Sequence, residues 1–137
     1  LMFAGLFVQT EFIFYRAIVQ LKNAKHENFF KKTITIRKVG RTIAKVKKWI
    51  DSVPENHEYK LWLLKGLIEE LKGNLQGAII LFEQAANEAE KQKFTHNAAI
   101  CYKLMSETCQ NIGYNVRSTQ YKEKSKELFD SWGFKEN

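Results

Sequence analysis

Proline is nearly absent from this chain, which has one proline and only seven glycines in 137 residues. Folds with many tight turns use these two residues at regular intervals, so their scarcity disfavours an all-β fold. Long alternation of apolar and polar residues, the pattern of half-buried strands, is also missing. The composition, 45% hydrophobic and 27% charged, is nevertheless that of a globular protein. We expect one domain spanning 1–137, because 16.1 kDa leaves room for no more.

Cysteine is equally scarce, with Cys101 and Cys109 as the two examples. If both lie on one helix, eight residues separate their Cα atoms by about 12 Å. A disulfide requires a Cα separation of about 7 Å or less. The spacing therefore predicts two free thiols in a reducing compartment, and we expect a cytoplasmic protein.

Signatures of catalysis and of cofactor binding are missing too. The sequence has no GxxxxGK[ST] loop for a nucleotide phosphate. The histidines do not share a helix turn with a cysteine or a carboxylate at the spacing of zinc ligands. They are His26, His57 and His96. Neighbouring carboxylates such as Glu69 and Glu70 follow a helix-surface pattern rather than that of a catalytic cleft. We therefore expect a protein that is not an enzyme and that uses no cofactor and no metal.

No hydrophobic run is long enough to cross a membrane without interruption. The most apolar segment, residues 1–21, contains Glu11 and Arg16, whereas a membrane span needs about 20 predominantly apolar residues. It also lacks the positively charged start of a secretory signal. We expect a buried helix that packs either on this chain or on a missing neighbour, because the start at leucine suggests a piece cut from a longer protein.

The sequence has helical periodicity along most of its length. Apolar residues recur at spacings of three and four in six segments. These segments are about 1–21, 30–52, 58–72, 74–92, 95–113 and 115–133. In the second of them, a regular apolar stripe runs from Ile36 to Ile50, and we expect Gly40, inside the same helix, to allow close packing against the first helix. Pro54 predicts the end of that second helix.

Glycine and polar residues mark the expected turns between the later helices. Gly73 and Gly113 are expected to close helices, since glycine readily adopts the left-handed conformation found there. Asn74, Thr95 and Asn115 are expected to cap the helices that follow. Short turns of this kind predict antiparallel neighbours.

A repeat of 40 residues relates two of the expected hairpins. The shift places Trp62 on Tyr102 and Gly73 on Gly113. Within the earlier copy, large and small residues follow the frame of a tetratricopeptide repeat (TPR). The residues in that frame are Trp62, Gly66, Ala78, Phe82 and Ala85. We therefore predict an all-α fold of three antiparallel helical hairpins, 1–53, 58–92 and 95–133, stacked as a TPR-like α-solenoid fragment.

Several stretches carry a closer resemblance. They are Lys47-Lys48-Trp49, Pro54-Glu55-Asn56, Gly77 to Ala85, Phe94 to Ala99, and the closing Trp132-Gly133-Phe134. In this order they resemble the TPR-like region of large bacterial multidomain signalling ATPases, over residues 10 to 134. Such proteins place a protein-kinase-like and a AAA-type ATPase domain before this region, and often a GAF domain and a histidine kinase after it. Ser118 and Ser125 depart from that pattern, which favours alanine.

The resemblance implies a non-catalytic interaction and coupling module of a signal-transduction protein, with protein partners and with catalysis in the flanking domains. By analogy with TPR stacks, the first helix of each hairpin lines a peptide-binding groove. The candidate binding residues are Lys60, Leu63, Leu67, Glu70, Lys103, Glu107 and Gln110. These residues could instead cover a neighbouring hairpin or face water. A stand-alone peptide-binding TPR adaptor is the alternative function.

Positive charge is concentrated in the first part of the chain. Residues 1–53 contain 11 basic and 3 acidic residues. Lys38, Arg41, Lys45 and Lys48 follow one helix face, which we call the basic stripe. It could be a solvated face, a contact with an acidic protein or domain, or a site for nucleic acid or acidic lipid. No interleaved aromatic residues point to a groove for single-stranded nucleic acid.

Overall fold

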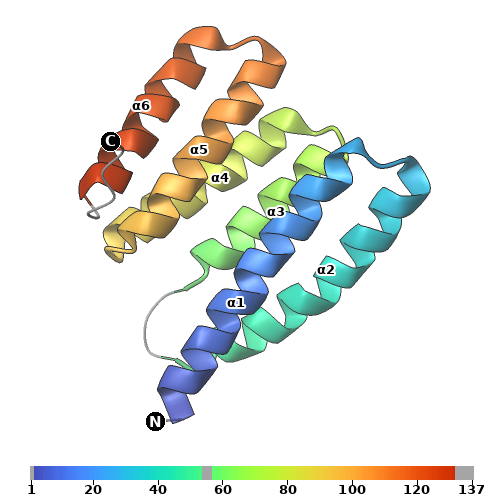
Figure 1. Cartoon of the computed structure of the whole chain (residues 1–137), viewed down its shortest axis with the longest axis vertical. Coiled ribbons are helices and arrows are strands. Elements are labelled where there is room, and N and C mark those ends of the chain that lie inside the picture. The colour runs from blue at the N-terminus through green and yellow to red at the C-terminus, as the bar shows by residue number, and fades with distance from the viewer. Residues whose placement is uncertain (1, 54–56, 132–137) are drawn as a thin grey trace. The chain divides into compact units, whose positions relative to one another are not determined.

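The structure is a computed structural model that describes the backbone of residues 2–53 and 57–131, and side chains from residue 8 onward. The elements in these residues are helical, which confirms the predicted all-α class. They are α1 (Met2–Asn23), η1 (Ala24–His26), α2 (Phe29–Ile50), α3 (Tyr59–Leu71), α4 (Leu75–Lys91), α5 (Thr95–Ile112) and α6 (Asn115–Ser131) (Figure 1). Two stretches that carry the resemblance, Pro54-Glu55-Asn56 and Trp132-Gly133-Phe134, lie outside the described residues.

The chain divides into two units, Leu1–Asn56 and His57–Asn137. In the first unit, α1 and α2 run antiparallel and are joined through the short 3-10 helix η1 (Figure 1). In the second unit each helix packs against the next, α3 on α4, α4 on α5 and α5 on α6. The helices of the second unit are connected by short turns, so successive helices run antiparallel.

The apolar stripe of α2 is buried where the periodicity predicts it. Val39, Val46 and Ile50 are buried, and the Asn28 side chain caps the helix by accepting a hydrogen bond from the Lys31 N–H at 2.9 Å. The expectation for Gly40 is wrong. Gly40 is exposed, and a Cβ placed there would meet nothing within 4 Å. Because Gly40 lies on the outer side of α2, it permits no close helix approach.

Three turns of the second unit have the same backbone geometry at intervals of 20 residues. Gly73, Lys93 and Gly113 each adopt the left-handed conformation, with φ of 86°, 65° and 94°. In each turn the following N–H reaches back five residues to a carbonyl, as in Phe94 N to Ala89 O at 2.8 Å. This is the Schellman arrangement, which satisfies carbonyls at a helix end. The predicted turns at both glycines are confirmed, and the lysine turn between them was not predicted.

The starts of the later helices agree with the sequence only in part. The Asn74 side chain accepts a hydrogen bond from the Gly77 N–H at 3.1 Å, which confirms the predicted cap. The predictions that Thr95 and Asn115 are caps are wrong, because both are the first residues inside their helices. The preceding residues, Phe94 and Tyr114, end the Schellman turns and accept the first helical hydrogen bonds. The shorter connections therefore place each helix start one residue earlier than expected.

Small residues allow α3 and α4 to approach closely. A Cβ added to Gly66 would lie 2.6 Å from Cε1 of the buried Phe82 ring and 3.3 Å from the Ala78 carbonyl oxygen. Contacts that short do not occur between real atoms, so the ring occupies the space that the missing side chain leaves. Phe82 thus packs against the backbone of α3, which is the large-to-small relation that the repeat pattern indicated.

Buried serines connect α5 and α6 through backbone carbonyls. The Ser118 hydroxyl donates to the Ser106 carbonyl at 2.9 Å, and Ser106 donates to the Ser118 carbonyl at 2.8 Å. Two turns of helix further along, Ser125 donates to the Ala99 carbonyl at 2.7 Å. Serine is only slightly larger than alanine, so it keeps the helices close and adds a hydrogen bond. This explains physically how serine can occupy positions where the TPR-like pattern favours alanine.

Three side-chain hydrogen bonds join the α3–α4 hairpin to the α5–α6 hairpin with one constant offset. Asn97 donates to the Tyr59 hydroxyl at 2.6 Å, Gln76 donates to the Tyr114 hydroxyl at 3.4 Å, and Thr108 donates to the Glu70 carboxylate. Each pair is separated by 38 residues. A constant separation means that the second hairpin is displaced along the first without a change of direction or register.

Candidate functional site

All four residues of the basic stripe are exposed, as are the other basic residues of α2 except the half-buried Lys32. This helix contains eight basic residues and no acidic residue in 22 positions. Neighbouring cations four residues apart repel one another along a helix. Such a concentration favours a partner that supplies negative charge, because that partner would relieve the repulsion.

Two exposed aromatic side chains lie at the start of the same helix. Phe29 is 85% exposed and Phe30 is 72% exposed, and Ile34 one turn later is 38% exposed. At 100° per residue, Phe30 and Ile34 share a helix face with Arg41 and Lys45 of the basic stripe. The sequence analysis missed these aromatic residues. The signal available was a pair of adjacent phenylalanines directly after a helix-capping asparagine, outside the apolar stripe.

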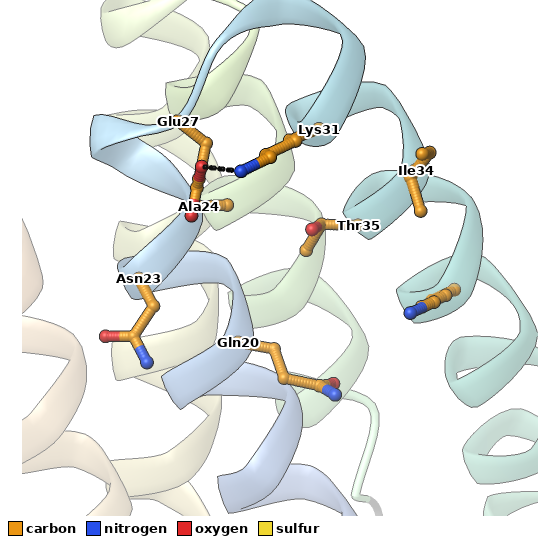
Figure 2. A pocket seen from close by; sticks show the side chains of 8 residues that line it. Gln20, Asn23, Ala24, Glu27, Lys31, Ile34 and Thr35 are labelled. Atoms are coloured by element: carbon orange, nitrogen blue, oxygen red, sulfur yellow. Dashed lines mark ion pairs between the residues drawn. The ribbon is translucent and has the colours of Figure 1, made fainter.

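A hollow lies beside this surface, between the end of α1 and the start of α2. Gln20 and Asn23 of α1 and Lys31, Ile34 and Thr35 of α2 are among its lining residues (Figure 2). Glu27 forms an ion pair with Lys31 across a turn, at 3.6 Å. The pair is well exposed, so it contributes at most about 1 kcal/mol. Besides this pair, the lining includes Lys38 of the basic stripe, together with uncharged polar and apolar side chains, and it has no group of residues arranged for catalysis.

The candidate groove residues divide into buried and accessible ones. Lys60, Leu63 and Leu67 are buried, at 0%, 0% and 1% exposed. Lys103 and Gln110 are exposed, and Glu70 and Glu107 are half-buried. Glu70 accepts the hydrogen bond from Thr108 and thereby contributes to the contact between the two hairpins. The side chains open to a partner are accordingly those near Lys103 and Gln110 on α5.

Lys60 belongs to a buried cluster of aromatic and polar groups at the start of the second unit. Its Nζ lies 3.1 Å from Nδ1 of His57 and 5.1 Å from the centre of the Tyr59 ring. The Phe94 ring lies within 5.8 Å of the same nitrogen. Aromatic faces attract cations, so these rings compensate part of the cost of burying an amine. The cluster ties α3 to the α4–α5 turn, and its position is structural.

A second polar cluster connects three helices of the second unit. The Tyr102 hydroxyl of α5 donates to Glu90 of α4 at 2.6 Å, and Lys124 of α6 lies 3.8 Å from the same carboxylate. Burial, together with the hydrogen bond and the charge of Glu90, raises the pKa of Tyr102 above its ordinary value of 10.0. The phenol therefore stays protonated and continues to donate its hydrogen bond at physiological pH.

Cys101 and Cys109 are free and buried, as predicted. Burial raises the pKa of the Cys101 thiol far above its ordinary value of 9.0. Burial also raises the pKa of Cys109, against a smaller opposing effect from Arg117. A thiol nucleophile reacts as the thiolate, so both residues are chemically inert in the folded protein.

Two searches of the described residues gave no candidate. In residues 2–53 and 57–131, no three His, Cys, Asp or Glu side chains converge in a group that could hold a metal ion. Among the helices described here, none offers an apolar stretch long enough to cross a lipid bilayer.

Comparison with known proteins gave no match to a protein family, to a curated protein or to a solved structure.

Proposed function

We propose that this chain is a non-catalytic, TPR-like helical-repeat module of a cytoplasmic multidomain signal-transduction protein, in which it connects and couples flanking domains. The observation that carries the proposal is the regularity of the second unit. Its three Schellman turns recur every 20 residues, and three of the hydrogen bonds between its hairpins join residues that are 38 positions apart.

Regular stacking is a physical basis for coupling. In a helical-repeat array each hairpin contacts mainly its neighbours, so a rotation of one hairpin changes the orientation of the next. The α3–α4 and α5–α6 hairpins are joined by packing and by hydrogen bonds that span both ends of α3 and α5. A load applied to one hairpin would therefore be transmitted to the other with little internal bending.

The resemblance to the TPR-like region of signalling ATPases supplies the specific role. One of its features is consistent with the packing described above: Phe82, in the stretch Gly77 to Ala85, is buried beside Gly66. Ser118 and Ser125 depart from its pattern, but their hydrogen bonds keep α5 and α6 in close contact. In such proteins the catalytic groups lie in the flanking domains. The proposed module would act by positioning those domains.

The first experiment measures the intact mass of the native polypeptide that contains this sequence in its source cell. We expect a mass far above 16.1 kDa, because a coupling module requires domains to couple. A native mass near 16 kDa would overturn the proposal. A second experiment places Gly66→Val in the full-length protein, where a coupling role predicts loss of the regulated output while the isolated catalytic domains keep their activity.

Peptide binding is the alternative favoured by the accessible surface of α5. Lys103 and Gln110 are exposed there and lie two helical turns apart. An adaptor would show saturable binding of an extended peptide that is lost in Lys103→Glu. The matched control is Lys122→Glu on α6, which is also exposed and makes the same charge change.

A further inference from the structure

The start of α2 combines exposed apolar side chains with a helix that contains eight basic residues, and this combination indicates the chemistry of a partner. We define the hairpin tip as Phe29, Phe30 and Ile34, which are 85%, 72% and 38% exposed. The basic stripe continues from the tip along the same helix, which contains no acidic residue. A partner that covers both surfaces has to supply an apolar environment next to a dense negative charge.

The helix phase allows one flat partner to contact both surfaces. Phe30, Ile34, Arg41, Lys45 and Lys48 follow one another at spacings of 4, 7, 4 and 3 residues. These are helical spacings, so the five side chains project from one side of α2. A planar surface laid along this side would meet Phe30 and Ile34 at one end of the helix and the cations along the rest. Phe29 precedes Phe30 at the first position of the helix, about 100° around its axis, and borders that surface.

An anionic membrane surface matches this arrangement better than nucleic acid does. Phosphates would pair with the stripe, but bases offer no site for the aliphatic Ile34, and a duplex backbone would leave both phenylalanines in water. A bilayer accepts aromatic and aliphatic groups at the boundary of headgroups and acyl chains, and its anionic headgroups attract the neighbouring lysines. Phenylalanine next to lysine is the composition typical of helices that bind at this interface.

We propose that α2 binds the surface of an anionic lipid membrane, with the hairpin tip inserted among the lipids and the basic stripe in contact with their headgroups. The proposal concerns the first unit and is independent of the coupling role, which is carried by the second unit. Its failure would leave the mass measurement above unaffected.

Co-sedimentation with lipid vesicles tests the proposal on the full chain. We expect binding to vesicles that mix phosphatidylglycerol with phosphatidylcholine, and little binding to phosphatidylcholine alone. Each cation near an anionic surface contributes about fivefold in affinity. Replacing Lys38, Arg41, Lys45 and Lys48 together by glutamine should therefore weaken binding by more than about 100-fold.

A matched charge variant is essential, because any chain of net charge +7 is attracted to anionic vesicles. The control replaces four exposed lysines of the second unit, Lys72, Lys91, Lys122 and Lys126, by glutamine. It makes the same change in net charge. Equal weakening by the two variants would overturn a site on α2.

The tip is tested by the double substitution Phe29→Ser and Phe30→Ser. We expect at least about a tenfold loss of vesicle binding, since even partial insertion of two phenylalanines removes a large apolar area from water. The control is Ile80→Ser with Val116→Ser, at side chains that are 59% and 74% exposed on other helices. All four side chains are exposed, so folding, checked by circular dichroism, should be unchanged.

Unchanged vesicle binding by the Phe variant would overturn insertion. Tighter binding of a single-stranded oligonucleotide than of the anionic vesicles would overturn the lipid assignment.

Discussion

The two units differ in where their polar groups are directed. The net charge of +7 lies entirely in the first unit, because residues 57–137 contain 11 basic and 11 acidic residues. In the second unit, Glu70 and Glu90 bond to groups on other helices of that unit. In the first, α2 directs its cations and its two phenylalanines to solvent. The second unit uses polar groups such as these in contacts between its helices, whereas α2 of the first unit exposes most of its basic residues to solvent.

This contrast separates the two roles that a small helical protein has to fill. Regular hairpins with identical turns and one hydrogen-bond offset are suited to transmitting position. In the second unit some polar groups are used in contacts between helices, as at Glu70 and Glu90. In the first unit the basic residues of α2 are mostly exposed, so they are open to a partner.

The substitution with the largest expected effect on the stability of the second unit is Gly66→Ala. The added Cβ would lie 2.6 Å from the buried Phe82 ring, and the ring has to move. We expect a loss of about 2–3 kcal/mol in the free energy of unfolding, typical of overpacking in a core. Urea denaturation followed by circular dichroism measures it. Gly40→Ala is the matched control, because its Cβ meets nothing within 4 Å, and it should be neutral or slightly stabilising. Similar losses in both variants would contradict the packing of Phe82 on α3.

The next test removes one hydrogen bond between the hairpins. Thr108→Val keeps the shape of a buried side chain but removes the hydroxyl that donates to Glu70. A hydrogen bond to a charged group contributes about 1.5–3 kcal/mol, and the half-buried position of Glu70 favours the lower end. The control is Thr119→Val, where the exposed hydroxyl bonds only within its own helix, to the Asn115 carbonyl. If both variants lose the same free energy, the bond between hairpins has no special contribution.

Helical periodicity predicts much of this fold, because burial of an apolar stripe requires little more than the right spacing. The burial of the apolar stripe of α2 follows from that rule. The turns at Gly73 and Gly113 follow from the preference of glycine for the left-handed conformation. The turn at Lys93 could not be predicted in this way, because lysine, unlike glycine, gives no indication of a left-handed conformation. The structure shows it through the hydrogen bond from the Phe94 N–H to the Ala89 carbonyl, which closes the same turn as at the two glycines. The prediction for Gly40 was wrong because a small residue in a helix permits close packing but does not require it.

The candidate surfaces were less predictable than the fold. The basic stripe was found because charge and spacing are both visible in the sequence. The groove was assigned by analogy with TPR stacks, and three of its seven residues, Lys60, Leu63 and Leu67, are buried. An analogy states which helix faces a groove, whereas the exposure of one side chain depends on the neighbours that pack beside it. Phe29 and Phe30 were overlooked because aromatic residues are normally counted as core.

Alkaline pH provides a test specific to the second unit. Burial raises the pKa of the Cys101 thiol in the folded protein above its ordinary value of 9.0. The stabilising effect of keeping this thiol protonated is therefore complete below pH 9.0 and is lost as the pH rises further. We expect the free energy of unfolding to fall by up to about 1.4 kcal/mol per pH unit there, from this group alone. Urea midpoints measured across this range should fall less steeply in Cys101→Ala. An unchanged slope would mean that the buried thiol does not control the alkaline limit.

The smallest expected effect is a gain of stability from Lys93→Gly. Lys93 occupies a left-handed turn, with φ of 65°, at the position where the two equivalent turns have glycine. An L-amino acid with a side chain is disfavoured in this conformation by about 1 kcal/mol relative to glycine. Part of the gain is offset because glycine increases the entropy of the unfolded chain. We expect an increase of up to about 1 kcal/mol in the free energy of unfolding, measured by urea denaturation.

Gly113→Ala should show a loss of similar size, because it places a Cβ at the equivalent turn. Opposite signs in these two variants would show that the turns at Lys93 and Gly113 both favour glycine, as their shared left-handed conformation predicts. A loss of stability in both variants would contradict a conformational cost at Lys93.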